Sequence, residues 1–356
     1  MIDFLVIGGG IAGLSAGAAL TELGSVTLLE TESALGYHAS GRSAALFEAQ
    51  YGLPPVVALN KASESTHRDG GYLSDRGLML VGSADQEERF NADCDTLGMK
   101  RIDIAEARAL LPVLNPDKAR FTAFHHDAWD IDTDRVLQDY ARVIRSAGGH
   151  VATAEQAQAI ARDGDKWRVE TAQNTYFARQ IVNAAGAWAD QIAGLAGVPP
   201  IGLVANRRSM ARIPAPGGLD VRNWPMMLGV GESWYAKPDA GKLLVSPAEE
   251  DPVDPHDAWA DDMVLAEGLA RYEALVSEPV TRLETSWAGL RTFAPDRVLV
   301  LGPDLIAPGF IWCAGQGGYG FQSAPAAARL LADLIGGRTS ELPTDTVSQL
   351  RPDRLR

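Results

Sequence analysis

The chain has 356 residues, of which 46% are hydrophobic and 22% charged, and its formal net charge is -14. This composition is typical of a soluble globular protein, and the length predicts two domains or one large α/β unit. The acidic balance disfavours nucleic acid and anionic lipid as partners, so we expect neither.

The cysteines and the N-terminus indicate the compartment. Cys94 and Cys313 show no metal-ligand spacing, so we expect no metal site, no disulfide framework and a reducing environment. The apolar run begins at Ile2 without a basic leader, and no apolar segment approaches the roughly 18 residues of a spanning helix. We therefore expect a cytoplasmic protein with neither a signal peptide nor an integral membrane segment.

The first thirty residues form a dinucleotide-binding pattern. In chain order it consists of an apolar strand (Phe4 to Ile7), Gly8, Gly10 and Gly13 in G-x-G-x-x-G spacing, a helix (Ala12 to Leu23), and a strand (Val26 to Leu29) that ends on Glu30. The glycines permit a tight turn and close approach of a pyrophosphate, and the helix N-terminus offers free N–H groups. Glu30 can accept hydrogen bonds from a ribose and would repel the 2′-phosphate of NADP. The pattern alone does not separate FAD from NAD.

Three later segments have the character of the same domain. Asp132 to Thr153 predicts an amphipathic helix and a strand, Lys166 to Asp190 predicts strands that run into a turn of small residues, and Phe310 to Gly337 predicts a strand, a glycine loop and an alanine-rich helix. The last unit offers a second set of backbone amides to an anion or a ring carbonyl. A simple tight turn is the alternative interpretation.

Between these segments the chain changes character. Gly77 to Ile131 and Ile201 to Thr285 contain short β-rich runs punctuated by proline, and 254–275 reads as helical. We predict one discontinuous, antiparallel domain inserted into the first. The predicted nucleotide-binding domain comprises residues 1–76, 132–200 and 286–356, and the predicted substrate domain comprises 77–131 and 201–285.

One arginine stands inside an apolar run, "SWAGLRTF" (Ser286 to Phe293). A buried guanidinium without a partner is costly, so Arg291 must meet an anion. That anion is either an acidic residue of the protein or a carboxylate substrate, which a planar guanidinium can hold through two parallel hydrogen bonds.

The motifs together resemble a known family. The glycine fingerprint, "GYHASGRSAA", "IVNAAGAWA", "WAGLRTFAPD" and "AGQGGYGFQ" occur in the order seen in FAD-dependent amino acid oxidases and dehydrogenases of the D-amino acid oxidase (DAO) superfamily. "AGAWADQIAGLAGV", "YAKPDAG" and "QGGYG" more narrowly resemble the bacterial D-arginine dehydrogenases over nearly the whole length. The resemblance implies an α/β fold, with a Rossmann-like FAD-binding domain of the glutathione-reductase type and an inserted, mixed-sheet substrate domain.

The resemblance also implies the cofactor site. Arg42, Ser43 and Ala44 match the turn that approaches the isoalloxazine ring, Ala157 matches the adenine end, and Gly317 to Gln322 match the segment against the pyrimidine edge. The full implied set is Gly8, Gly10, Ala12, Gly13, Glu30, Thr31, His38, Ala39, Gly41, Arg42, Ser43, Ala44, Ala157, Ala185, Gly186, Gly317, Gly318, Tyr319, Gly320, Phe321 and Gln322. We expect non-covalent FAD, because the cysteine that sarcosine oxidase-like relatives use has no counterpart after Arg291.

The implied substrate site centres on Arg291 as the carboxylate ligand. Arg208 matches a second basic residue, Tyr51 and Tyr235 match tyrosines that close over the substrate, and the Gly289 carbonyl and Gln322 match groups near the amine. An ordinary salt bridge for Arg208 and plain aromatic packing for the tyrosines are the alternatives that the residues alone leave open.

Two positions depart from the D-arginine dehydrogenase pattern. Leu78 stands near the place of the acid that receives the guanidinium, and Leu46 replaces a histidine. An apolar pocket does not stabilise a buried cation, so we predict a neutral, hydrophobic amino acid. Glu48 is the residue that could restore the charge, and two ordinary core leucines would carry no information on the substrate.

The implied reaction is oxidative deamination. Hydride transfer from Cα to FAD N5 would give an imino acid, which hydrolyses to a 2-oxo acid and ammonia. The alternatives are a glycine, sarcosine or cyclic imino acid oxidase, a 2-hydroxy acid oxidase, and a non-catalytic flavin-binding subunit, which the presence of Arg291 and the Gln322 loop disfavours. The enantiomer beyond the resemblance, the oligomeric state and the electron acceptor, whether oxygen or a respiratory-chain quinone, stay open.

Overall fold

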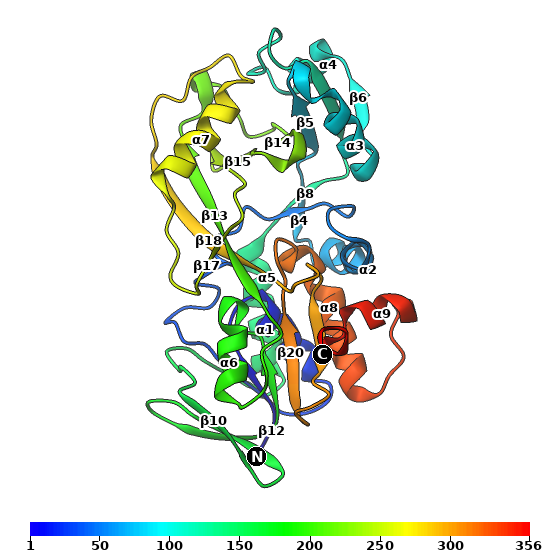
Figure 1. The fold of residues 1–356 in the computed structure, drawn as a ribbon, viewed down its shortest axis with the longest axis vertical. Coiled ribbons are helices and arrows are strands. Elements are labelled where there is room, and N and C mark those ends of the chain that lie inside the picture. The colour runs from blue at the N-terminus through cyan, green and yellow to red at the C-terminus, as the bar shows by residue number, and fades with distance from the viewer.

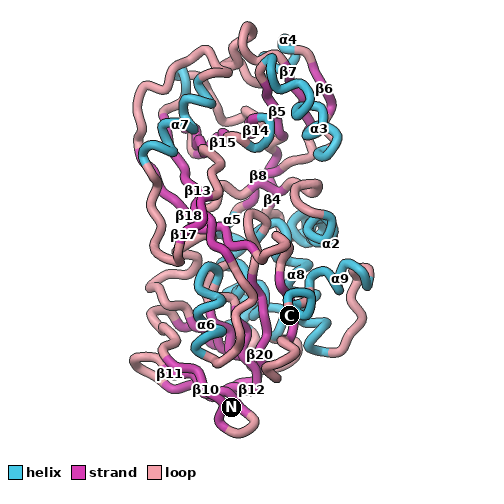
Figure 2. Tube along the Cα trace, viewed as in Figure 1, coloured by secondary structure: helices cyan, strands magenta, loops and turns pink.

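A computed structural model describes all 356 residues. The molecule has two lobes, and both chain ends lie in the lower lobe of the view (Figure 1). Strands run through both lobes (Figure 2). None of the helices combines the length and apolarity needed to cross a membrane.

The lower lobe is built on a sheet of eight strands. They are β1 (Ile2–Ile7), β2 (Val26–Leu29), β9 (His150–Ala152), β10 (Ala159–Asp163), β11 (Lys166–Glu170), β12 (Thr175–Asn183), β19 (Val300–Pro303) and β20 (Phe310–Ala314). Strands β9, β2, β1, β12 and β20 are parallel neighbours in that order. The β10–β11 hairpin and β19 add antiparallel pairs.

This sheet has a hydrophobic core on each of its two faces, and successive side chains of β1 enter one core and then the other. Phe4 and Val6 join the core that contains α1 (Ile11–Leu20), α5 (Thr133–Ser146) and α8 (Gly320–Gly336). Leu5 and Ile7 join the opposite core, which contains Trp312 of β20. A strand buried on both faces reads as an uninterrupted apolar run, which is why the sequence predicted β1 and β20.

The upper lobe is built on a second sheet of nine strands. They are β5 (Leu78–Gly82), β6 (Lys100–Ile102), β7 (Phe121–His125), β13 (Val204–Ile213), β14 (Met226–Gly229), β15 (Tyr235–Asp239), β16 (Lys242–Ser246), β17 (Asp251–Val253) and β18 (Thr285–Phe293). Only β14 and β5 are parallel neighbours, so the sheet is mixed. Helices α3 (Glu87–Leu97), α4 (Ile104–Leu110) and α7 (Asp262–Glu273) accompany it. The predicted Rossmann-like α/β fold with an inserted mixed-sheet unit is confirmed.

Strand β18 crosses between the lobes beside β13 (Figure 1). It pairs with β13 from Thr285 to Phe293, so its hydrogen bonds belong to the second sheet. The boundary predicted at residue 286 therefore falls inside a strand, because the apolar run continues into the first lobe without a break in composition.

The junction between the lobes has its own small sheet, formed by β3 (Leu46–Phe47), β8 (Trp129–Ile131) and β4 (Leu73–Asp75). Helix α2 (Pro54–Asp69) packs on α8 there, and Ser63 accepts a hydrogen bond of 3.0 Å from the amide of Ala326. The remaining helices are α6 (Ala189–Leu195) and α9 (Thr344–Leu350).

The helical prediction over 254–275 was too long at its start. Helix α7 begins at Asp262, because the Asp261 carboxylate accepts the amide hydrogens of Met263 and Val264 and so caps the helix. Residues 254–261 instead form a non-helical segment.

Candidate active site

The turn between β1 and α1 depends on glycine. A Cβ atom at Gly8 would lie 2.3 Å from the carbonyl oxygen of Ala184, and one at Gly13 would lie 1.9 Å from the Gly8 carbonyl oxygen. Helix α1 therefore packs directly on the ends of the central strands. No side chain caps the helix, and the amides of Gly10, Ala12 and Gly13 have no acceptor within the protein. Free amides at a helix N-terminus form a phosphate site.

Glu30 is buried at the end of β2. One carboxylate oxygen accepts the Gly9 amide at 2.6 Å and the other accepts the Glu32 amide at 2.8 Å. Glu32 in turn lies 2.9 Å from the ring nitrogen of His38, whose ring packs on Trp188. These contacts fix the acid beside the glycine turn. Thr31 is exposed next to it.

A second set of free amides lies at the start of α8. The amides of Gly318, Gly320, Phe321 and Gln322 have no acceptor within the protein. His67 of α2, which sequence reasoning missed, holds this turn from behind, because its Nε2 donates to the Phe321 and Gln322 carbonyls at 3.1 and 3.2 Å. Burial lowers the pKa of His67, so the ring stays neutral.

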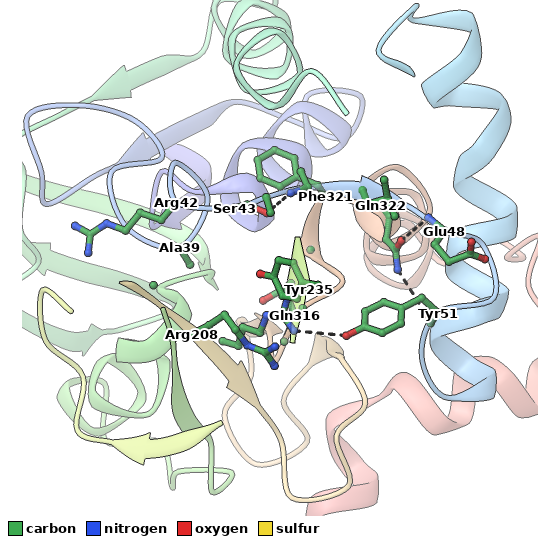
Figure 3. Close-up of a pocket in the computed structure, with 18 of the residues that line it drawn as sticks. Ala39, Arg42, Ser43, Glu48, Tyr51, Arg208, Tyr235, Gln316, Phe321 and Gln322 are labelled. Atoms are coloured by element: carbon green, nitrogen blue, oxygen red, sulfur yellow. Dashed lines mark hydrogen bonds between the residues drawn. The ribbon is translucent and has the colours of Figure 1, made fainter. Parts of the chain in front are cut away.

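The turn at residues 42–45 contributes a third set of free amides, those of Ser43 and Ala44. Arg42 itself points away from the cavity (Figure 3). Its guanidinium lies 2.5 Å from Asp257 and 2.9 Å from each of the Ala258 and Ala288 carbonyls. The arginine side chain thus ties the turn to the loop before α7.

A cavity of about 180 Å³ lies among these elements. The predicted residues on its wall are Ala39, Arg42, Ser43, Ala44, Leu46, Tyr51, Leu78, Arg208, Tyr235, Gly289, Arg291, Gly317, Gly318, Gly320, Phe321 and Gln322. The chain segments that supply them are as far apart as residues 39 and 322, and the fold brings them together.

The other predicted cofactor residues lie outside this wall. Gly8, Gly10, Ala12, Gly13, Glu30 and Thr31 lie at the first turn and at the end of β2, and His38 and Gly41 lie in the loop between β2 and β3. Tyr319 precedes α8, and Ala185 and Gly186 follow β12. Ala157 is buried in the core that contains Leu5, Ile7 and Leu29.

Arg291 has no ion-pair partner. No acidic oxygen lies within 4.0 Å of its guanidinium, and its only hydrogen bond within the protein is to the Tyr51 hydroxyl at 3.5 Å. The internal ion pair that the sequence left open is therefore absent. A cation that is unpaired on a cavity wall is a receptor for an anionic ligand.

Arg208 lies on the neighbouring strand, opposite Gly289 in the β13–β18 pairing. Its guanidinium is within 3.1 Å of Glu250. Burial and the nearby charge of Arg291 lower the pKa of Arg208. Arg208 is thus both a cavity residue and a salt-bridged one, so the two interpretations of the sequence apply together.

Tyr51 lies at the wall between the two lobes. Its hydroxyl donates to Glu232 at 3.0 Å and accepts from Arg291. Burial raises the pKa of Tyr51, so the phenol stays protonated. The side chain of Gln322 contacts the backbone of the segment that contains Tyr51. Its Oε1 accepts the Glu48 amide at 3.1 Å, and its Nε2 donates to the Tyr51 carbonyl at 3.5 Å. Figure 3 shows the contacts of Gln322 with Glu48 and Tyr51.

One end of the cavity is apolar. Leu46 and Leu78 lie there with side chains that the sequence had not indicated, namely Leu97, Met210, Met226 and Leu228. Glu48 also lines the cavity. One of its carboxylate oxygens accepts the Gln50 amide, and the other lies 2.9 Å from the His125 ring nitrogen without a hydrogen bond. This contact is an ion pair only when the His125 ring is protonated.

Sequence reasoning missed Glu232 and Gln316 of the wall. Glu232 has a positive φ of 53° although it is not glycine, a conformation that an amino acid sequence does not report. Gln316 lies inside the glycine loop that was recognised, so its position was the available signal.

Cys313 of β20 is buried, and burial raises the pKa of its thiol to about 12. The thiol donates to the Ala12 carbonyl at 3.6 Å. A protonated, buried thiol is a poor nucleophile, in agreement with the expectation of non-covalent cofactor binding.

Comparison with known proteins agrees with this geometry. Residues 3–334 match the family "DAO: FAD dependent oxidoreductase". The chain is 27% identical to glycine oxidase of Pseudomonas aeruginosa, over 94% of each chain, and 24% identical to N-methyl-L-tryptophan oxidase of Citrobacter koseri, over 70% of this chain and 73% of that protein.

The fold is shared with L-proline dehydrogenase from P. horikoshii. The TM-score is 0.84 at 20% identity, and the match covers 99% of this chain and 97% of the other. The narrower resemblance to D-arginine dehydrogenases rests on the sequence motifs. Because the family match covers most of the chain and the free amides fit a dinucleotide, the chain belongs to the FAD-dependent oxidoreductase family named DAO, and FAD is its cofactor.

Proposed function

We propose that this protein oxidises a free amino acid with a neutral, hydrophobic side chain to the imino acid. The D enantiomer is proposed from the sequence motifs. The imino acid then hydrolyses in water to a 2-oxo acid and ammonia. The observation that carries the proposal is the unpaired guanidinium of Arg291 on the wall of a largely apolar cavity, beside the free amides of α8.

Arg291 is the proposed carboxylate ligand. It is free of acidic partners, and two parallel N–H donors match the two oxygens of a carboxylate. Arg208 lies diagonally across the β13–β18 pair and adds positive charge, but Glu250 already offsets part of it. We therefore propose that Arg291 is the main ligand of the carboxylate and that Arg208 adds a weaker electrostatic attraction.

The substrate side chain is proposed to lie against Leu46, Leu78 and the methionines. A guanidinium or ammonium placed there would lose its hydration with no free carboxylate to replace it. Glu48 also lies on the wall, with one carboxylate oxygen bound to the Gln50 amide and the other 2.9 Å from the His125 ring, so both oxygens already face neighbours in the protein. This arrangement favours leucine- or methionine-like substrates over arginine.

The chain's own residues orient the substrate. Arg291 fixes the carboxylate, the apolar wall holds the side chain, and Tyr51 and Tyr235 enclose the space between them, with the Gly289 carbonyl on the wall as an acceptor for the amine. FAD supplies the redox chemistry by accepting the hydride from Cα. No histidine lines the cavity, which fits a substrate whose amine binds unprotonated. Orientation of this kind is the main catalytic contribution that the residues offer.

A second candidate is oxidation of glycine or of an N-methyl or cyclic amino acid. The names of the relatives, glycine oxidase, N-methyl-L-tryptophan oxidase and L-proline dehydrogenase, favour it. Such substrates carry the same carboxylate, so Arg291 could bind them equally well. A non-catalytic flavin-binding role is disfavoured, because Arg291 forms no ion pair within the protein and so stays available to an anionic ligand.

The test is an anaerobic screen for bleaching of the flavin absorbance. The panel contains D- and L-leucine, D- and L-methionine, D-arginine, glycine, sarcosine and L-proline. The proposal predicts the fastest bleaching with D-leucine or D-methionine, with release of the 2-oxo acid and ammonia. Bleaching led by D-arginine would contradict the neutral-substrate proposal, and bleaching led by sarcosine or L-proline would establish the second candidate. Repetition in air with peroxide detection shows whether oxygen is the electron acceptor.

A further inference from the structure

Lys237 is a buried lysine inside the YAKPDAG motif, to which the family resemblance assigned no role. It lies on β15, two residues after Tyr235, and only 8% of it is exposed. Desolvation on burial lowers its pKa, and the nearby carboxylate of Asp130 opposes that effect. A lysine in this setting requires partners for all three of its donors.

The three partners are present. The ammonium group donates to the carbonyl oxygen of Ala44, to that of Ala45 at 2.9 Å, and lies 2.8 Å from Asp130 Oδ1. Two of these acceptors belong to the turn at residues 42–45, whose Ser43 and Ala44 amides are free toward the cavity. The lysine thus holds the turn by its carbonyls and leaves its amides available.

The third partner links the lysine to the junction of the lobes. The other oxygen of Asp130 accepts from Arg76 Nε and NH2 at 2.8 and 2.6 Å. Arg76 also donates to the Arg222 and Trp224 carbonyls at 2.8 Å each. Asp130 lies on β8, which pairs with β3 directly after the turn. The Lys237–Asp130–Arg76 network therefore fixes the turn to the strands that connect the lobes.

The turn needs such support. Ala45 has a φ of 23°, in a region that residues with a Cβ atom rarely adopt. The carbonyl of Arg42 is also taken, by Trp287 Nε1 at 3.2 Å. Side chains therefore hold three carbonyls of the turn, and Lys237 supplies two of these contacts.

Lys237 and Tyr235 share one strand, and side chains two residues apart on a strand point to the same face. Tyr235 lines the cavity and Lys237 holds the turn beside it. We propose that Lys237 is a positioning residue that sets the conformation of the 42–45 turn against the bound flavin and couples that turn to the substrate strand β15. This inference rests on FAD binding and not on the proposed substrate.

The test compares Lys237→Met with Lys242→Met. Methionine reproduces the unbranched stem of the lysine side chain but lacks the terminal ammonium group and its donors. Lys242 is the matched control, because it lies on the same β15–β16 hairpin and pairs with Glu284 at 2.8 Å, and its side chain is 36% exposed. Each holoprotein is examined for its visible flavin spectrum and its midpoint potential, and FAD is titrated back to deflavinated protein to obtain Kd. Thermal unfolding is recorded in parallel.

We expect Lys237→Met to raise the FAD Kd by about tenfold or more and to shift both the flavin spectrum and the potential, because a buried charge-assisted contact to the turn is lost. Lys242→Met should match the wild type in all three. If Lys237→Met lowers thermal stability but leaves the FAD Kd, the flavin spectrum and the potential unchanged, the proposal is overturned. Lys237 would then stabilise the fold without positioning the turn against the flavin.

Asp130→Asn is the second variant, for the case that Lys237→Met does not fold. It keeps the lysine and its carbonyl contacts but removes the ion pair. The proposal predicts changes in the same direction and of smaller size, and wild-type values for Kd, spectrum and potential would contradict it. These readouts do not involve an amino acid, so the inference and the proposed substrate can fail separately.

Discussion

Gly318 packs against the guanidinium of Arg291. A Cβ atom at residue 318 would lie 2.9 Å from both Cζ and NH1 of Arg291, closer than carbon and nitrogen atoms approach without displacement. The glycine loop before α8 therefore does two things at once, since it offers free amides and leaves room for the proposed carboxylate ligand.

Gly318→Ala should therefore displace Arg291. We expect KM for the amino acid to rise by about tenfold, because a misplacement of 1 Å in a positioned group can cost up to a hundredfold. The FAD content should stay near that of the wild type. The control must be a glycine whose backbone conformation alanine can adopt, and this excludes Gly337 because its φ is 65°. Gly194→Ala is suitable, because a Cβ there meets nothing within 4 Å. An unchanged KM in Gly318→Ala would show that the guanidinium does not hold the carboxylate.

Arg291→Ala should lower kcat/KM by about 30-fold to 1000-fold, the range expected when one partner of a buried charged pair is removed. Arg208→Ala should cost less, because Glu250 already pairs with that arginine. Arg212→Ala is the matched control on the same strand, as it pairs with Asp239 at 3.5 Å. Equal losses in Arg291→Ala and Arg212→Ala would contradict the assignment.

Tyr51→Phe removes the hydrogen bond to Glu232 and the contact to Arg291. We expect KM to rise by about tenfold, the cost of one hydrogen bond to a charged group, with kcat changed less. Glu232→Gln keeps an acceptor for the phenol and should show the smaller effect. If Glu232→Gln proves as damaging as Tyr51→Phe, the carboxylate charge has a role of its own.

Leu78→Glu tests the apolar end of the cavity. A carboxylate there would be surrounded by the apolar side chains of Leu97, Met210 and Leu228. We expect kcat/KM for D-arginine to rise relative to D-leucine, while Leu78→Gln, of the same size but without charge, should lower D-leucine turnover only. A ratio that is the same in both variants would place the substrate side chain elsewhere.

Acid precipitation tests the mode of FAD attachment. The pKa of the Cys313 thiol is raised to about 12 by burial, so the thiolate is absent at neutral pH. We expect all the yellow flavin to remain in the supernatant when the protein is precipitated. Flavin retained in the washed pellet would demonstrate a covalent bond.

Several features were predictable because their signals are local. Consecutive residues are enough to predict the apolar strand β1, the glycine turn after it, and the strand, loop and helix of 310–337. The structure has the same elements. The leucines at positions 46 and 78 likewise predicted an apolar wall, and both line the cavity.

The features that were missed depend on partners far apart in the chain. Arg42 turns to Asp257, Lys237 reaches the carbonyls of Ala44 and Ala45, and His67 holds the first turn of α8. No periodicity or spacing reports such contacts, because the tertiary fold decides which residues meet. The start of α7 was misplaced for another reason, because the helical pattern alone does not mark a boundary, whereas the structure shows that Asp261 accepts the first helix amides.

The most direct test of the central claim compares the best amino acid of the anaerobic screen with its carboxamide, in the wild type and in Arg291→Ala. The carboxamide keeps the size of the substrate but removes the negative charge that Arg291 is proposed to hold. We predict that the wild type bleaches far faster with the acid than with the carboxamide, and that Arg291→Ala loses most of this preference. An undiminished preference for the acid in Arg291→Ala would show that another group binds the carboxylate.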